Sequence, residues 1–239
     1  MYFASNVSFS SLPVFLPLIL KEMGFTAVNA QGLTAPPYFV SFVLTLATTY
    51  FADRLQQRGL TIMIMAAIGG IGYVILATTE SVGPRYFGVF LAAGGIFPVI
   101  ANTIPWVLSM LQPLRFIVFI ILIWSDLDNQ GSDTKRGSGI TLLNIIGQCG
   151  PLLGTRIYPS QQGPFYKEGM SICAAFMFLT GILALGLRTG LAFENRRLNA
   201  QYGTRLDAGT IEMMHSEEEV KQFTAVGEEN EGPMFRYIL

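Results

Sequence analysis

The sequence is poor in the residues on which most enzyme sites depend. Its 239 residues include one histidine, His215, and two cysteines, Cys149 and Cys173. An HExxH zinc site needs two histidines, and no GxxxxGK[ST] phosphate loop occurs. The spans described below also hold no paired carboxylates or nucleophile with a base. We therefore expect no enzyme activity, no metal and no cofactor. Each cysteine falls within an apolar run without a CxxC partner, so both are interpreted as small buried hydrophobes.

Charged residues are also scarce. They make up 13% of the chain, whereas about a quarter is usual in soluble domains, and 51% of the residues are hydrophobic. The net charge is -1, and the basic residues lie in loops without forming a continuous patch. This composition excludes a soluble domain and a nucleic-acid partner, and it predicts a protein whose solvent is the lipid bilayer.

Uncharged runs of about 20 residues predict an all-α membrane protein with about six transmembrane helices. The clearest pair is residues 36–52 and 60–79, which are free of charge and are joined by a short turn containing Asp53, Arg54 and Arg58. None of the spans holds an Asp, Glu, Lys, Arg or His residue at mid-membrane. The six expected spans are residues 2–20, 32–52, 60–79, 86–109, 138–158 and 170–191.

The distribution of Lys and Arg predicts the orientation. Alternate loops carry one cation each, namely Lys21, Arg85 and Lys167, whereas the other loops carry several. Because cytoplasmic loops accumulate Lys and Arg, the turn with Arg54 and Arg58 and both termini are expected in the cytoplasm. We expect a multi-pass protein of the plasma membrane.

The composition divides the chain into an apolar part and a polar tail, and one segment interrupts the apolar part. We expect a six-helix transmembrane unit over residues 1–192 and a cytoplasmic, disordered acidic tail over residues 193–239, in which positions 207–239 hold eight acidic and two basic residues. Residues 110–128 interrupt the pattern with an apolar run too short to span, and they are expected to be an atypical insert. Since no basic segment precedes the first apolar run, we expect the chain to begin within a longer protein.

Glycines and polar residues recur at helical spacing inside the spans. The clusters at 69–72, 94–95 and 150–154 favour close helix packing. Polar stripes on four spans either join helices by hydrogen bonds or line a water-filled pathway, because lipid does not satisfy such groups. Single Ser and Thr residues favour the first interpretation and large amides favour the second. The substrate-cavity candidates are Asn6, Ser10, Tyr38, Asn102, Trp106, Asn144 and Gln148.

Several short motifs are informative when their order and spacing are taken together. The motifs are YFADR (50–54), RG (58–59), RYFG (85–88), AAGGIFP (92–98), TKRG (134–137), NIIG (144–147), IY (157–158) and ENRR (194–197). With these motifs, the sequence resembles the C-terminal half, helices seven to twelve, of fungal allantoate permease-type transporters, in the anion:cation symporter group of the major facilitator superfamily.

The resemblance implies secondary active transport of a small organic anion, such as allantoate, nicotinate or a related vitamin, driven by protons in the full-length relative. It further implies that substrate binds between two six-helix halves, so that the partner of this chain is a missing N-terminal half or a second copy. Asp53, Arg54 and Arg58 would then belong to a cytoplasmic latch between the halves. The alternative is a non-transporting membrane protein or a nonfunctional truncated product.

Overall fold

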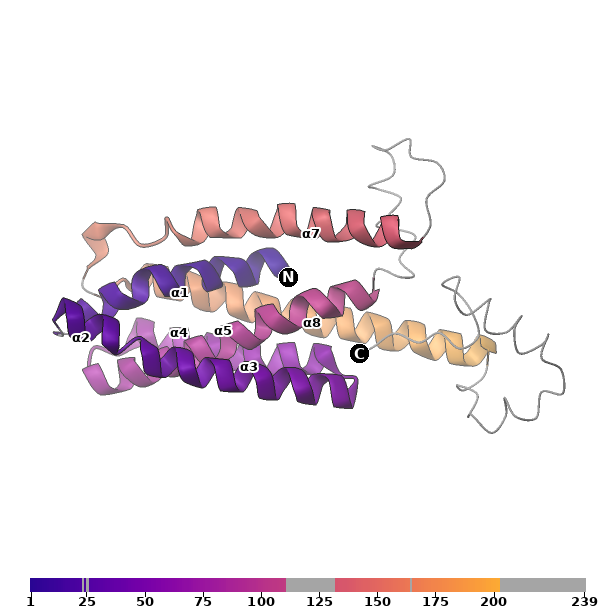
Figure 1. Ribbon diagram of the computed structural model, residues 1–239, viewed down its shortest axis with the longest axis horizontal. Coiled ribbons are helices and arrows are strands. Elements are labelled where there is room, and N and C mark those ends of the chain that lie inside the picture. Colours follow the sequence, from indigo (N-terminus) through magenta and orange to yellow (C-terminus); the bar gives the residue numbers. More distant parts are fainter. Residues whose placement is uncertain (23, 25, 111–131, 164, 203–239) are drawn as a thin grey trace.

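The computed structural model describes residues 1–22, 24, 26–110, 132–163 and 165–202, and these residues are almost entirely helical (Figure 1). Six long helices run roughly parallel or antiparallel to one another. A short helix, α2 (Ala27–Gly32), and a 3₁₀ turn, η1 (Ser160–Gln162), lie in the connections. The long helices are α1 (Tyr2–Glu22), α3 (Ala35–Leu55), α4 (Arg58–Thr78), α5 (Val82–Met110), α7 (Ser132–Gly154) and α8 (Lys167–Tyr202).

Each expected span corresponds to one long helix, which confirms the all-α membrane fold. Four of the helices, α1, α4, α5 and α8, are both long and apolar enough to cross a bilayer. The other two, α3 and α7, have 21 and 23 residues, which is sufficient length, but they are less apolar. The difference arises because α3 carries several threonines and tyrosines, and because α7 begins with the polar sequence SDTKRGSG.

Helix α4 is the centre of the bundle, and it packs most extensively against α5 and α8. Gly69 of α4 faces Gly95 of α5 so closely that a Cβ atom on Gly95 would lie 2.6 Å from the carbonyl oxygen of Met65 and would also meet the Gly69 backbone. One turn away, Gly72 packs equally closely against the backbone of α5 at Gly88, Leu91 and Ala92. The prediction that these glycines permit close helix packing is confirmed.

A second close crossing joins α7 to α1. Three glycines on one face of α7, Gly147, Gly150 and Gly154, lie directly on the first three turns of α1. A Cβ atom on Gly150 would lie 2.7 Å from the carbonyl oxygen of Phe3. The packing predicted for the GxxxG sequence at 150–154 is therefore present. In Figure 1, α7 lies on one side of α1, and α3 lies on the other side of the bundle.

The structure extends the expected boundaries at two places. The connection after α1 contains α2, which begins after Thr26, whose hydroxyl oxygen accepts a hydrogen bond from the Asn29 backbone N–H at 3.4 Å. Helix α8 continues to Tyr202, ten residues beyond the expected end of the membrane unit at 192. The tail from 203 and the expected insert at 110–128, apart from Met110 itself, lie outside the described residues.

Candidate functional site

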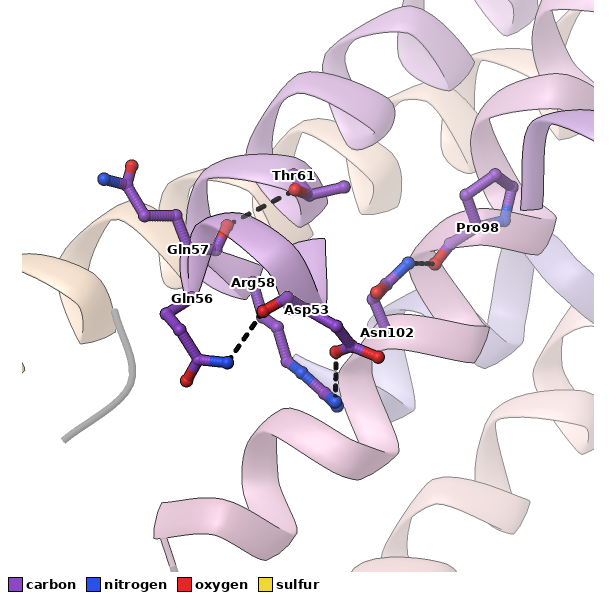
Figure 2. Close-up of polar contacts among 7 residues, drawn as sticks. All are labelled: Asp53, Gln56, Gln57, Arg58, Thr61, Pro98 and Asn102. Carbon is purple, nitrogen blue, oxygen red and sulfur yellow. Dashed lines mark hydrogen bonds and ion pairs between the residues drawn. The ribbon is translucent and has the colours of Figure 1, made fainter. Parts of the chain in front are cut away.

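The turn between α3 and α4 forms a compact polar structure at one end of the bundle (Figure 2). Gln56 ends α3 in the left-handed conformation, with φ of 53°, and its side-chain amide donates to the Asp53 carbonyl oxygen at 2.7 Å. This sharp reversal brings Arg58, the first residue of α4, back to the Asp53 carboxylate, and the two form an ion pair. Arg54 points elsewhere and donates to the hydroxyl of Tyr50 at 3.1 Å.

Asn102 lies on α5 close to this turn, as Figure 2 shows. Its side chain is completely buried, and its amide nitrogen donates to the carbonyl oxygen of Pro98 at 2.9 Å. Two atoms in this region have no hydrogen-bond partner among the described residues, namely the Asn102 Oδ1 acceptor and the Arg58 Nη1 donor. Because buried polar groups are normally paired, these two atoms mark a polar region at the junction of α3, α4 and α5.

Trp106 occupies the next turn of α5 and is also fully buried. Its ring lies against Gly59, the second residue of α4. The Cβ atom of Arg188 of α8 lies on the same side of Gly59, and the Arg188 guanidinium donates to the side-chain oxygen of Gln57 at 3.3 Å. The structure thus brings Asp53, Arg58, Asn102 and Trp106 to the same end of the bundle, with Trp106 serving as packing for the α4 N-terminus.

Three other cavity candidates lie on α3 and α7. Tyr38 is half-buried, and its ring makes an edge contact with Phe97 at a centroid distance of 5.6 Å. Asn144 is half-buried on α7, and Gln148, one turn further on, is exposed. These three side chains are therefore accessible from outside the six-helix unit, whereas Asn102 and Trp106 are not.

The two candidates on α1 face α7. Asn6 is buried, its Nδ2 atom has no hydrogen-bond partner, and it lies next to Gly147 and Gly150. Ser10 is half-buried and donates to the carbonyl oxygen of Val7 at 3.2 Å, within its own helix. Ser41, Thr45 and Thr48 of α3 likewise donate to carbonyl oxygens one turn back in their own helix. These hydroxyls are satisfied locally and do not need a water-filled pathway.

The interpretation of both cysteines as buried hydrophobes is wrong for Cys149, which is exposed. Its helix, α7, packs through the glycine face that contacts α1, and Cys149 points away from that face. Cys173 of α8 is buried as expected. It is, however, part of a polar network.

This network was not found from the sequence. Tyr73 of α4 donates to the carbonyl oxygen of Ser8 at 2.9 Å, and the Ser8 hydroxyl donates to the carbonyl oxygen of Cys173 at 3.0 Å. The Cys173 thiol lies 3.3 Å from both the Ser11 and the Tyr158 hydroxyls. The network therefore links α1, α4 and α8 in the interior. The spacing of Ser5, Ser8 and Ser11 along α1 is the sequence signal that could have indicated it.

The opposite end of the bundle is held by charged side chains of the connections. Lys167 donates to the Glu80 carboxylate at 2.8 Å, and this hydrogen bond lowers the pKa of Glu80 below its usual value. Arg85, expected to be a loop cation, is fully buried instead. Its guanidinium lies over the Phe165 ring, 5.1 Å from the centroid, and donates to the Phe165 carbonyl oxygen at 3.5 Å.

Comparison with known proteins identifies the relatives of this helical bundle. The chain is 32% identical over 237 residues to the MFS-type transporter cnsO of Penicillium expansum, covering 96% of this chain. This chain is related to fungal MFS-type transporters over nearly all of its length. The high-affinity nicotinic acid transporter of Saccharomyces cerevisiae is 28% identical over 174 residues, or 73% of this chain. The major facilitator-type transporter hxnP of Emericella nidulans is 23% identical over 99% of this chain.

The similarity covers nearly all of this chain but only part of each relative. The matched regions are 40% of cnsO, 29% of the nicotinic acid transporter and 43% of hxnP. No protein-family profile matches the chain, and no solved structure does. The transporter names and the apolar helices together make this a multi-pass membrane protein related to transporters.

Proposed function

We propose that the chain forms one six-helix half of a secondary transporter that carries a small organic anion across the plasma membrane. The observation that carries this proposal is its similarity to named MFS transporters, one of which is a nicotinic acid transporter. Nicotinate and allantoate represent the substrate class, and proton coupling belongs to the complete transporter. Both termini and the α3–α4 turn lie in the cytoplasm in this proposal, as the Arg54 and Arg58 cations favour.

The surface for the second half consists of the outward faces of α3 and α7. Both helices have few neighbours within the unit, because α3 packs mainly on α5 and α7 mainly on α1. Each exposes large apolar side chains that a second six-helix unit would cover, either the N-terminal half of a longer protein or a second copy. These side chains include Phe39, Phe42 and Leu46 on α3 and Ile145, Ile146 and Leu152 on α7.

Within that surface, we assign substrate contact to Tyr38, Asn144 and Gln148. Their phenol and amide groups suit hydrogen bonds to a carboxylate or a heteroaromatic ring, and their partial exposure supports this role. Ser10 lies at the edge of the same region. Asn6, Asn102 and Trp106 are buried, so in this proposal they shape the cavity wall from behind.

The proposed cytoplasmic latch consists of Asp53, Arg54 and Arg58. The Asp53 side chain remains 49% exposed although it is paired with Arg58, whose side chain is 18% exposed. Its second carboxylate oxygen could therefore accept from a helix N-terminus of the other half, where the helix dipole favours negative charge.

Uptake of labelled nicotinate tests the proposal in cells that express this chain together with a six-helix N-terminal half from a relative. We expect uptake with both parts present, and a lower uptake with Gln148→Leu at equal surface expression. Gln161→Leu is the matched control, because Gln161 is also exposed but lies beyond α7, within η1. Equal uptake by the Q148L and Q161L variants would remove Gln148 from the substrate site.

The alternative is a membrane protein that does not transport. One observation favours it, namely that residues 36–52, 60–79 and 86–109 contain no Asp, Glu, Lys, Arg or His side chain that could carry a proton at mid-membrane. Absence of uptake at every pH between 4 and 8, with normal surface expression and with the second half present, would support this alternative and contradict the transporter.

A further inference from the structure

Helix α8 is longer than a bilayer core requires. It contains 36 residues, and its membrane-compatible part runs from Lys167 to Arg197. At about 1.5 Å per residue these two residues lie about 45 Å apart along the axis, or about 42 Å across a membrane at the usual tilt of about 20°. A bilayer with its headgroups is about 40–45 Å thick, so the two ends of this segment lie at the levels of the two headgroup layers.

The cations of α8 occupy different depths on this scale. Lys167 is paired with Glu80 at one end, which places that pair in one headgroup layer. Arg188 lies about 31 Å further along, near the edge of the hydrocarbon core, and it is half-buried and bonded to Gln57. Arg196 and Arg197 lie about 12 Å beyond Arg188, and both are exposed. They are therefore the two α8 arginines available to groups in the second headgroup layer.

The side chains around Arg196 and Arg197 suit the boundary between membrane and water. Phe193 is 68% exposed, and the Arg196 guanidinium lies over its ring at 6.0 Å from the centroid. Arg197 is 77% exposed in its side chain, and its distance of 3.9 Å from the Glu194 carboxylate leaves most of its donors free. Aromatic rings and arginines gather at this depth because the ring enters the interface while the guanidinium stays among polar groups.

Helix α3 presents a similar combination at the same end of the bundle. Its last turns expose Tyr50 and Phe51, and Arg54 bonds to the Tyr50 hydroxyl. Figure 1 shows the end of α3 and the C-terminal half of α8 directed toward the same side of the molecule. Two helices thus offer aromatic and arginine side chains to a single leaflet.

From this arrangement we infer that Phe193, Arg196 and Arg197 bind the phosphate headgroup of an anionic phospholipid in the leaflet at the α3–α4 end. A planar guanidinium donates two parallel hydrogen bonds to phosphate oxygens, and Phe193 packs beside the upper part of the acyl chains. In the proposed orientation this is the cytoplasmic leaflet, which carries the anionic lipids. The site does not depend on whether the chain transports a substrate.

Binding of a fluorescent phosphatidylserine to the full chain in neutral mixed micelles tests this site. The R196Q/R197Q variant should raise the half-saturating lipid concentration by about fivefold for each arginine removed, the usual value for a basic residue at an anionic surface. The R196K/R197K variant, which keeps both charges, should recover part of the affinity. A phosphatidylcholine probe should show no difference among these proteins.

The K21Q/R156Q variant is the matched control, because it removes two exposed cations near the opposite end of the bundle. It should leave binding of phosphatidylserine unchanged. If R196Q/R197Q binds the probe as the unmodified chain does, the site is wrong, and an acidic occupant such as residues 217–219 of this chain becomes the better partner. Equal losses in both double variants would also overturn it, since the effect would then report net charge alone.

Discussion

The indole ring of Trp106 lies where any residue other than glycine at position 59 would place its Cβ atom. An ideal Cβ on Gly59 would be 2.6 Å from Cζ2 of Trp106 and 3.4 Å from Cβ of Arg188. Gly59 is the second residue of α4 and directly follows Arg58 of the Asp53–Arg58 pair, so this contact fixes the position of the polar turn against α5 and α8.

Substitution of Gly59 should therefore destabilise the bundle although it improves helix propensity. Gly59→Ala should lose about 1–3 kcal/mol, because the ring of a fully buried tryptophan has little room to move. In a helix the same substitution would otherwise gain up to about 1 kcal/mol. Denaturation of the purified protein in detergent measures the change. Gly190→Ala is the control, since nothing lies within 4 Å of that position, and it should be neutral or stabilising.

Removal of the Tyr73 hydroxyl should weaken the link between α4 and α1. Tyr73 is fully buried and its hydroxyl donates to the Ser8 carbonyl oxygen, so Tyr73→Phe loses one interhelical hydrogen bond without leaving a cavity. Such bonds contribute about 0.6 kcal/mol on average and up to about 1.7 kcal/mol in membrane proteins. Tyr50→Phe should have a smaller effect, because Tyr50 is exposed and bonds within α3. A larger loss in Y50F than in Y73F would contradict the network.

The Glu80–Lys167 pair should make stability depend on acidity. The hydrogen bond and charge of Lys167 lower the pKa of Glu80 in the folded protein, so its contribution is present at neutral pH. It is lost as the pH falls through the lowered folded-state pKa. In thermal unfolding at low salt, the difference in stability between the unmodified chain and the Glu80→Gln variant should therefore be present at pH 7 and should shrink as the pH falls below the usual range for glutamate.

Lys167→Gln provides the control for this pair. In a K167Q background, the pH-dependent effect of Glu80→Gln should be smaller, because the main partner that lowers the Glu80 pKa is absent and only the charge of Arg85 still lowers it. The same difference between pH 7 and pH 3 with and without Lys167 would show that another group is responsible.

The helices could be predicted from the sequence because each one contains an uncharged run about as long as a bilayer core is thick. The glycine crossings at Gly69 and Gly150 were also predictable, since small residues at helical spacing permit close approach. The directions in which individual side chains point could not be predicted. Asn102 and Gln148 share a pattern in the sequence, yet one is buried and the other exposed, because burial depends on which neighbours pack against each helix. Likewise, neither the apolar run around Tyr73 nor the loop position of Arg85 showed that these side chains would be buried with partners.

The proposed transporter half and its cytoplasmic latch both require that the chain cross the membrane with its α3–α4 turn inside the cell. Labelling of intact cells with a membrane-impermeant maleimide measures this directly, in a background where both native cysteines are replaced, C149S/C173S. The Q161C variant, within η1, should be labelled in intact cells. The L55C variant, at the exposed end of α3, should be labelled only after permeabilisation. Labelling of L55C in intact cells, with Q161C protected, would contradict the orientation and the cytoplasmic latch.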